Sequence, residues 1–211
     1  MKPLPAHVVI EGPIGVGKTT LARRLAQRLG AELLLEAPHD NPFLARYYRE
    51  GARHALATQL AFLVQRAAQH RVLAGRRAAR PLVADFLFEK DALFARLTLA
   101  PDELALYEAL AARMALDAVV PDLVIYLRAE PATLAARVAR RADPAESGLS
   151  RAYLERLSAA YAEFFHRYEA APVLEVNTEH LDLADAPADL DLLLTRVAGM
   201  RGRREHFNLA A

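Results

Sequence analysis

A glycine-rich segment near the N-terminus has the residue types and spacing that bind phosphate groups. It reads Gly-Pro-Ile-Gly-Val-Gly-Lys-Thr from Gly12 to Thr19 and matches the pattern G-x-x-x-x-G-K-[ST] at every fixed position. Glycines let backbone N–H groups close around a phosphate, and the start of a following helix adds its partial positive charge. We expect Lys18 to contact the β- and γ-phosphates and Thr19 to bind a metal ion. The expected nucleotide-binding residues are Gly12, Pro13, Ile14, Gly15, Val16, Gly17, Lys18, Thr19 and Thr20.

Two carboxylates end short apolar runs further along the chain. Glu36 ends the run Glu32–Glu36, and Asp85 ends the run Pro81–Asp85. If both runs are parallel strands, their carboxyl ends meet at the edge of the sheet that also carries the phosphate-binding loop. A carboxylate there can take a proton from a substrate hydroxyl or hold a metal ion through water. Either residue taken alone is also compatible with a helix cap or a solvated loop charge, and their joint placement favours a site.

A third group of charged residues lies beyond the middle of the chain. Arg137, Arg140 and Arg141 precede a segment rich in Pro, Asp, Ser and Gly, Ala142–Ser150. Arginines on such a segment suit a lid that closes over phosphates and stabilises their charge. The alternative is a solvated basic helix end, because cations are favourable at helix C-termini.

Strand-like and helix-like patterns alternate along the whole chain, which is typical of an α/β protein with a parallel sheet. The predicted strands are His7–Glu11, Glu32–Glu36, Pro81–Asp85, Asp122–Leu127 and Val173–Asn177. The predicted helices are Thr19–Leu29, one around Leu56–Ala67, Pro101–Asp117, Pro131–Arg141, Ser150–Ala170 and one from about Ala184 to Arg204. We expect the P-loop NTPase fold: five parallel strands flanked by helices in one domain, residues 1–211, with an arginine-bearing lid at about 137–150.

Composition narrows the classes of protein. Hydrophobic residues make up 54% of the chain and charged residues 25%, which is typical of a globular protein. The net charge of +1 gives no indication of binding to nucleic acid or an anionic membrane, and the absence of cysteine excludes disulfides and cysteine nucleophiles. No signal peptide or membrane-length apolar run is visible, so we expect a cytoplasmic protein. The basic tail Arg201–Phe207 is expected to be solvated or to contact a partner.

Several segments together resemble the deoxynucleoside kinases, the P-loop enzymes of nucleoside salvage, and a bacterial branch in particular. The resemblance runs from roughly Val8 to Asn177. The matching segments are Ile10–Thr20 (phosphate loop), Leu34–Pro38 (Glu-Pro motif), Thr58 and Gln59 (Gln motif on the long helix), Leu123–Pro131 (fourth strand), Arg137–Glu146 (arginine lid) and Tyr153–Leu157 (following helix).

The resemblance implies a role for particular residues. Glu36 is then the base that deprotonates the 5′-hydroxyl of a deoxynucleoside, and Lys18, Arg137 and Arg141 are the other catalytic residues. Asp85 is the acidic residue near the metal, a Mg²⁺ ion that Thr19 also binds. The implied substrate-binding residues are Glu36, Tyr48, Gln59, Arg66, Asp85, Asp91 and Glu146.

The same resemblance assigns contacts to parts of the substrate. Gln59 would make a bidentate hydrogen bond to the base, while Tyr48 and Glu146 would hold the 3′-hydroxyl. Arg66 follows Gln59 by two helical turns, on the same face, and with Asp91 matches the pair that reads cytosine or purine bases. This favours a purine deoxynucleoside or deoxycytidine over thymidine.

Two positions depart from the family pattern. Phe86 follows Asp85 where the family usually has an arginine that contacts the 5′-oxygen and the phosphates, and Asp143 stands where a second lid arginine is expected. Either Lys90 or another lid arginine compensates, or the enzyme is slow, or its substrate differs.

The leading hypothesis is therefore an ATP-dependent deoxynucleoside kinase with Mg²⁺ as cofactor, which, like many members of the family, forms a homodimer. One alternative is another small-molecule P-loop kinase, such as a nucleoside monophosphate kinase. A second is a slow, nucleotide-dependent regulatory ATPase. A GTPase switch is disfavoured, because no Asn-Lys-x-Asp segment follows a strand.

Overall fold

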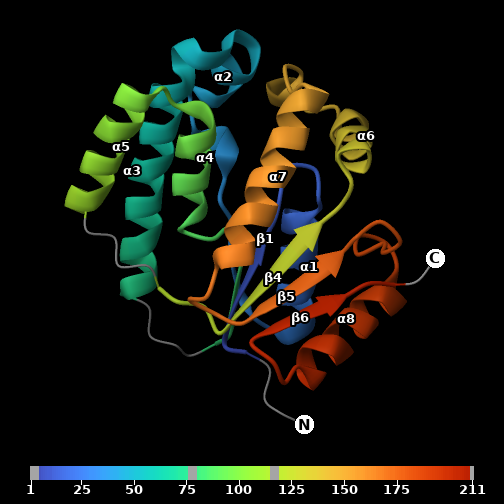
Figure 1. Ribbon diagram of the computed structural model, residues 1–211. Coiled ribbons are helices and arrows are strands. Elements are labelled where there is room, and N and C mark those ends of the chain that lie inside the picture. Colours follow the sequence, from blue (N-terminus) through green and yellow to red (C-terminus); the bar gives the residue numbers. More distant parts are fainter. Residues whose placement is uncertain (1–4, 76–79, 115–118, 210–211) are drawn as a thin grey trace.

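A six-stranded parallel sheet forms the centre of the protein in a computed structural model that describes residues 5–75, 80–114 and 119–209 (Figure 1). The strand order is β2-β3-β1-β4-β5-β6, and every neighbouring pair is parallel. The strands are β1 (His7–Glu11), β2 (Glu32–Leu34), β3 (Leu82–Ala84), β4 (Leu123–Arg128), β5 (Val173–Asn177) and β6 (Arg204–Phe207).

Helices cover both faces of this sheet, with α1 and α8 on one face and α4 and α7 on the other (Figure 1). Beyond α4, the helices α3 and α5 form an outer layer. The helices are α1 (Lys18–Leu29), α2 (Leu44–Glu50), α3 (Ala55–Ala74), α4 (Lys90–Thr98), α5 (Pro101–Met114), α6 (Pro131–Arg141), α7 (Arg151–Arg167) and α8 (Pro187–Gly199), with short 3₁₀ turns η1 (Pro38–Asp40), η2 (Gly51–His54) and η3 (Pro144–Glu146).

Alternating side chains of the central strands hold the two layers together. In β4, Leu123 and Ile125 pack toward α1 and α8, whereas Val124 and Tyr126 pack toward α7. All four are at most 4% exposed. Because period-two alternation with both faces apolar is what a doubly covered parallel strand requires, this pattern fixes β4 in the middle of the sheet.

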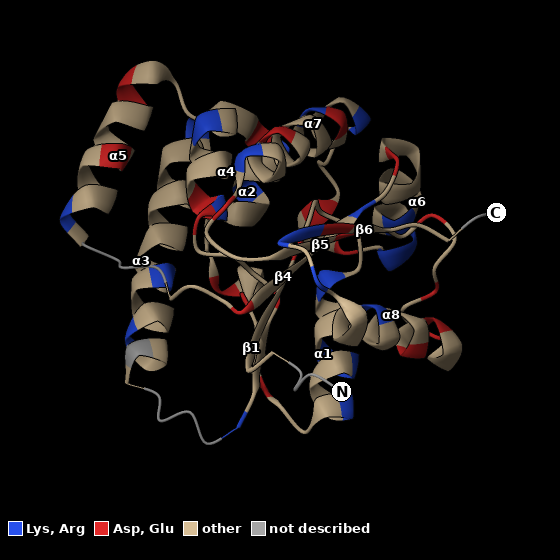
Figure 2. Cartoon of the chain, turned by 60° about the horizontal axis from the view of Figure 1, so that its bottom comes forward, with Lys and Arg blue, Asp and Glu red and all other residues tan. Residues whose placement is uncertain are grey.

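Local signals set the ends of several helices. Gly30 ends α1 in the left-handed conformation at φ 61°, and the side chain of Ser150 caps α7 by accepting a hydrogen bond from the Tyr153 N–H at 3.1 Å. In α5, Asp102 and Glu103 lie in the first turn and Arg113 in the last, as Figure 2 shows along that helix. This order of charges complements the helix dipole.

The phosphate loop follows β1 at the switch point of the sheet, where chain connections leave toward β3 on one side and β4 on the other. Gly12 has φ 150°, and a Cβ at this position would lie 2.3 Å from the Leu127 carbonyl oxygen of β4. Only glycine fits so close to the neighbouring strand. The loop is therefore anchored at the carboxyl ends of the strands, at the upper end of the sheet in Figure 1.

The structure confirms the predicted fold class and corrects its details. There are six strands rather than five, because Arg204–Phe207 forms the edge strand β6 beside β5 instead of ending a helix or lying free in solvent. One apolar residue, Phe207, is too weak a signal for a strand, yet an edge strand needs pairing on one side alone. The helices α2 and α4 were not predicted. Of the predicted helix Pro101–Asp117, the last three residues lie outside the described ranges.

Within those ranges, none of the helices combines the length and the apolar composition needed to cross a lipid bilayer.

Candidate active site

The side chain of Lys18 makes its hydrogen bonds within the phosphate loop itself. The Lys18 ammonium donates to the Gly12 carbonyl at 2.7 Å and to the Pro13 carbonyl at 3.2 Å. Burial lowers the pKa of Lys18, and the nearby Glu11 carboxylate partly opposes this effect. Since backbone carbonyls are weak partners for a cation compared with phosphate oxygens, a bound nucleotide would draw the ammonium away from them.

Thr19 and Asp85 meet beside this loop. The Thr19 hydroxyl donates to Asp85 Oδ2 at 2.5 Å, and the other carboxylate oxygen of Asp85 accepts the Glu36 N–H at 2.8 Å. A hydroxyl and a carboxylate at one point are oxygen donors of the kind that Mg²⁺ prefers, so the pair fits such an ion.

Glu36 lies in a loop rather than in a strand, because β2 ends at Leu34. The next residue, Ala37, has φ 54°, a left-handed conformation that an alanine adopts only when its surroundings impose it. Two glutamines of α3 hold the backbone beside it: Gln65 Nε2 donates to the Glu36 carbonyl at 2.6 Å, and Gln69 Nε2 to the Leu35 carbonyl at 3.2 Å. The backbone around Glu36 is thus fastened to α3.

Two cations hold the Glu36 carboxylate. Lys90 Nζ, at the start of α4, donates to Oε2 at 2.5 Å, and Arg66 of α3 donates to Oε1. Burial by itself would raise the pKa of Glu36, but the charges of Lys90 and Arg66 outweigh it and lower the pKa to about 2. The free protein therefore holds Glu36 ionised and paired on both oxygens.

Arg66 is the more firmly held of the two cations. It is 1% exposed, and its Nε donates to both carboxylate oxygens of Asp91, at 3.1 and 3.2 Å. Its Nη1 donates to Gln69 Oε1 at 2.6 Å, and its guanidinium carbon lies 4.2 Å from the centre of the Phe86 ring. Phe86, where the family pattern has an arginine, thus provides an aromatic surface on which Arg66 stacks.

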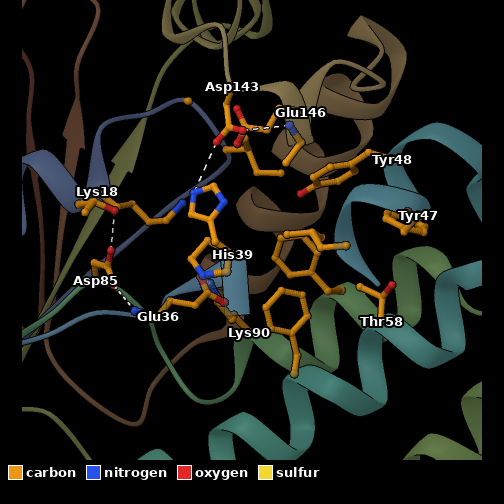
Figure 3. Close-up of a pocket in the computed structure, with 18 of the residues that line it drawn as sticks. Lys18, Glu36, His39, Tyr47, Tyr48, Thr58, Asp85, Lys90, Asp143 and Glu146 are labelled. Atoms are coloured by element: carbon orange, nitrogen blue, oxygen red, sulfur yellow. Dashed lines mark hydrogen bonds and ion pairs between the residues drawn. The ribbon is translucent and has the colours of Figure 1, made fainter. Parts of the chain in front are cut away.

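A cavity opens in front of Glu36 and brings together most of the residues that the sequence singled out (Figure 3). Figure 3 shows Glu36 and Lys90 on one side of it and Tyr47 and Tyr48 on the other. Arg66 lies behind the wall, whereas its partner Asp91 faces the cavity. The predicted residues that line it are Ile14, Gly15, Gly17, Lys18, Thr19, Thr20, Glu36, Tyr48, Gln59, Asp85, Asp91, Arg141 and Glu146.

A second cavity lies on the other side of the phosphate loop. It shares Gly15, Gly17, Thr20 and Arg141 with the first, and adds Arg137 and Arg140. Arg137 donates to the Thr178 hydroxyl at 2.9 Å and to its carbonyl at 2.8 Å. The predicted catalytic residue Arg137 is therefore placed in this second cavity and Arg141 in both. The remaining wall comes from residues 181–185, which follow β5.

The segment 142–150 follows α6 and contributes Asp143, Ala145 and Glu146 to the wall of the first cavity. Arg141 Nε donates to Glu146 Oε2 at 3.2 Å, so the two predicted residues are paired with each other. Asp143, at the position where the family pattern has an arginine, accepts the Ala145 N–H at 2.9 Å and lies 3.5 Å from Nε2 of His39 (Figure 3). A Cβ on Gly148 would lie 1.9 Å from the Tyr48 carbonyl oxygen, so this segment touches the backbone of α2.

The sequence analysis did not predict two aromatic side chains that line the first cavity, or the role of one buried carboxylate. Phe62 and Phe94 line the first cavity, and each follows a predicted residue, Gln59 or Asp91, by three positions. Helical i, i+3 spacing was the signal that could have found them. Glu11 was predicted only as a strand end, but it accepts hydrogen bonds from the Gly12 and Leu87 N–H groups, both at 2.8 Å, and from the Tyr161 hydroxyl at 3.0 Å.

A phosphate-binding loop between two cavities, with a hydroxyl and carboxylates beside it, defines a P-loop phosphotransferase. The family model described as deoxynucleoside kinase matches residues 8–200 of the chain. The protein therefore belongs to the deoxynucleoside kinase family, and the resemblance seen in its motifs is confirmed.

Individual relatives agree with this assignment. The chain is 33% identical over 181 residues to a deoxyguanosine kinase of Bacillus subtilis, a match that covers 84% of this chain and 87% of that relative. It is 27% identical over 206 residues to a deoxyadenosine/deoxycytidine kinase of the same organism, covering 94% of each. A solved deoxyadenosine kinase from M. mycoides has the same fold, with a TM-score of 0.80, 22% identity and coverage of 92% of this chain and 100% of that one.

The close approach of Gly148 to Tyr48 gives a first prediction. In Gly148→Ala, the added methyl group pushes the segment 142–150 off α2 and displaces Glu146. Because a small displacement of a binding residue weakens its contacts strongly, we expect the KM for the substrate bound in the first cavity to rise about 10- to 100-fold. The melting temperature should change little. Gly199→Ala is the matched control, since a Cβ there meets nothing within 4 Å. Equal KM values in the two variants would contradict the role of this contact.

Proposed function

We propose that this protein transfers the γ-phosphate of ATP to the 5′-hydroxyl of a deoxynucleoside, with a purine deoxynucleoside or deoxycytidine preferred over thymidine. The observation that carries the proposal is that two cavities meet at the phosphate loop, with the Glu36 carboxylate in the wall of the first. An ATPase needs a nucleotide site and water, whereas a kinase needs a second, shaped site for its acceptor.

The first cavity suits a deoxynucleoside in its chemistry. Phe62 and Phe94 offer aromatic surfaces for a base, and Gln59 and Asp91 offer polar groups for its edge. Gln59 is 3% exposed, and its Nε2 donates to the Thr98 hydroxyl at 3.2 Å, which fixes the orientation of its amide. Tyr48 and Glu146 would then hold the 3′-hydroxyl. Burial and the Glu146 charge raise the pKa of Tyr48, so its hydroxyl stays neutral and able to donate.

The second cavity suits the donor. Its arginines, Arg137 and Arg140, would face the phosphates or the ribose of ATP, while Arg141 reaches both cavities. We propose that the segment 137–150 is a lid that closes over the transferring group, within a single kinase domain of residues 1–211. The contact between Gly148 and α2 is what such a closed lid requires.

The reaction needs a proton acceptor and charge compensation. Glu36 takes the proton of the 5′-hydroxyl as its oxygen bonds to the γ-phosphorus and the bond to the bridging oxygen of ADP breaks. Lys18 and the lid arginines offset charge on the transferring group. Thr19 and Asp85 would hold Mg²⁺, which would neutralise part of the charge on the phosphates.

A homodimer is part of the same proposal. The groove between α4 and α7 is lined by Leu93, Leu97, Phe164 and Tyr168, with charged residues of both signs at its rim. Apolar residues framed by such charges suit a second copy of the chain. Light scattering at micromolar concentration should give a mass of twice 23.2 kDa, and the monomer mass would contradict the dimer.

An ADP-release assay with Mg-ATP and a panel of acceptors tests the proposed function. The panel holds the four deoxynucleosides, the corresponding ribonucleosides and their monophosphates. We expect release with one or two deoxynucleosides other than thymidine. Release with monophosphates would identify a nucleoside monophosphate kinase, and equal slow release with and without acceptor would identify an ATPase.

The role of Glu36 gives a second prediction. Glu36→Gln keeps the size of the side chain and removes the proton acceptor, so we expect turnover to fall by roughly 10²–10⁴-fold while ATP binding is largely kept. Glu155→Gln, which changes a carboxylate that is 50% exposed on α7, is the control. An unchanged turnover in Glu36→Gln would exclude Glu36 as the base.

A third prediction concerns the base edge. Asp91→Asn keeps the side-chain volume and replaces a hydrogen-bond acceptor facing the cavity with an amide. We expect kcat/KM for the preferred deoxynucleoside to fall about 10- to 100-fold or more, because a polar pocket rejects a mismatched partner strongly, while the KM for ATP stays the same. Asp191→Asn, at a side chain 59% exposed, should change neither. Equal losses for both substrates would make Asp91 a structural residue.

A further inference from the structure

Lys90 occupies a position that pairing with Glu36 alone does not explain. It is the first residue of α4 and 4% exposed, yet its side chain lines the first cavity together with Lys18. A buried ammonium is costly unless it is paired, and its partner here is the carboxylate proposed as the base. Glu36 Oε2 therefore both stabilises the buried Lys90 ammonium and belongs to the group proposed to accept the proton of the 5′-hydroxyl.

Each oxygen of the Glu36 carboxylate accepts a hydrogen bond from a cation. Arg66 donates to Oε1 and Lys90 to Oε2, so the 5′-hydroxyl of an acceptor meets a carboxylate with no oxygen free of a cation. Each oxygen can still accept a second hydrogen bond, but the two cations make Glu36 a weak proton acceptor, and loosening one contact would make it a stronger one. The contacts of each cation decide which one.

Arg66 is the fixed cation and Lys90 the mobile one. Arg66 also hydrogen-bonds Asp91 and Gln69 and stacks on Phe86, so moving it would break all three of these contacts. For the Lys90 ammonium, the hydrogen bond found among the described residues is the one to Glu36, and its contact with the Phe94 ring is long, 5.8 Å to the ring centre. Its four-carbon stem is flexible, and a compact ammonium can turn to a new partner without a fixed geometry.

The neighbourhood of Lys90 supplies that new partner. Lys18, the phosphate-loop lysine, lines the same cavity, and the charge of Lys90 contributes to lowering its pKa. Two ammonium groups that line one cavity are stabilised by an anion between them, and the transferring phosphoryl group is the anion proposed to bind there. Position 86, next to Asp85, carries a neutral ring that is engaged with Arg66.

We propose that Lys90 is a catalytic residue that changes partner during the reaction, leaving Glu36 Oε2 and contacting the γ-phosphoryl group when both substrates are bound. This inference rests on the proposed function. The proton of the 5′-hydroxyl then passes to the released Oε2, the 5′-oxygen bonds to the γ-phosphorus, and the electron pair of the broken bond leaves on ADP. One cation thus keeps Glu36 ionised beforehand and stabilises the phosphoryl group during transfer.

Neutral substitution of Lys90 is the first test. Lys90→Met keeps the length and the apolar stem, and we expect kcat to fall about 10²–10³-fold, with the KM for the deoxynucleoside within a few-fold of the original. Lys90→Gln is a second neutral variant in case the first does not fold. Arg28→Met is the control, because Arg28 is an ion-paired cation at the far end of α1 with a side chain 60% exposed. A folded neutral variant with unchanged kcat, or with a change in KM alone, would overturn the proposal.

The absence of cysteine from the chain allows a sharper test. Lys90→Cys can be unfolded, alkylated with 2-bromoethylamine and refolded, which rebuilds a lysine-like side chain with sulfur in place of one methylene. We expect alkylation to raise kcat at least tenfold over the unmodified variant, whereas Arg28→Cys and the original chain gain nothing from the same treatment. No gain in a refolded, alkylated Lys90 variant would show that the amine is not required.

These results separate the two proposals. If the unsubstituted protein phosphorylates deoxynucleosides and the neutral Lys90 variants keep its kcat, only the change of partner is wrong. If the unsubstituted protein transfers nothing to any deoxynucleoside, the proposed function fails and this inference with it.

Discussion

The buried carboxylate of Glu36, held between two cations, is the interaction on which the rest of this site depends. A carboxylate in that position would be protonated in an apolar setting, and Arg66 and Lys90 instead lower its pKa to about 2. Each cation comes from a different helix, and α3 and α4 must therefore both be packed in place for the site to exist. α3 and α4 are joined in one cluster that includes Leu63, Ala95 and Tyr107. The packing of α3 against α4 thus sets the protonation state of Glu36.

A second buried carboxylate connects the phosphate loop to the same framework. Glu11 accepts hydrogen bonds from Gly12 in the loop, from Leu87 just before α4 and from Tyr161 in α7. Because a fully buried carboxylate tolerates few changes in its partners, these three elements are fixed relative to one another. The phosphate loop and the helix that carries Lys90 are therefore both positioned by one residue.

The sequence predicts the parts of the structure that follow from local pattern. The phosphate loop, the ends of β1 and β5 and the meeting of Glu36 with Asp85 follow from a motif, from apolar runs and from the rule that parallel strands end at one edge. Long-range packing determines the rest. The edge strand β6 has one apolar residue, and the start of α4 at Lys90 depends on the loop after β3. Nothing local indicates that Phe86 stacks on Arg66 or that Glu11 bonds Leu87 and Tyr161, because these contacts join residues far apart in the sequence.

Transfer of phosphate to a sugar hydroxyl is the central claim, and phosphorus NMR observes it directly. A sample with Mg-ATP and the four deoxynucleosides is followed as the γ-phosphate signal disappears. The structure predicts a phosphomonoester signal coupled to the 5′-methylene protons of deoxyadenosine, deoxyguanosine or deoxycytidine, formed in step with ADP. Release of inorganic phosphate without any phosphomonoester would contradict the account and identify the protein as an ATPase.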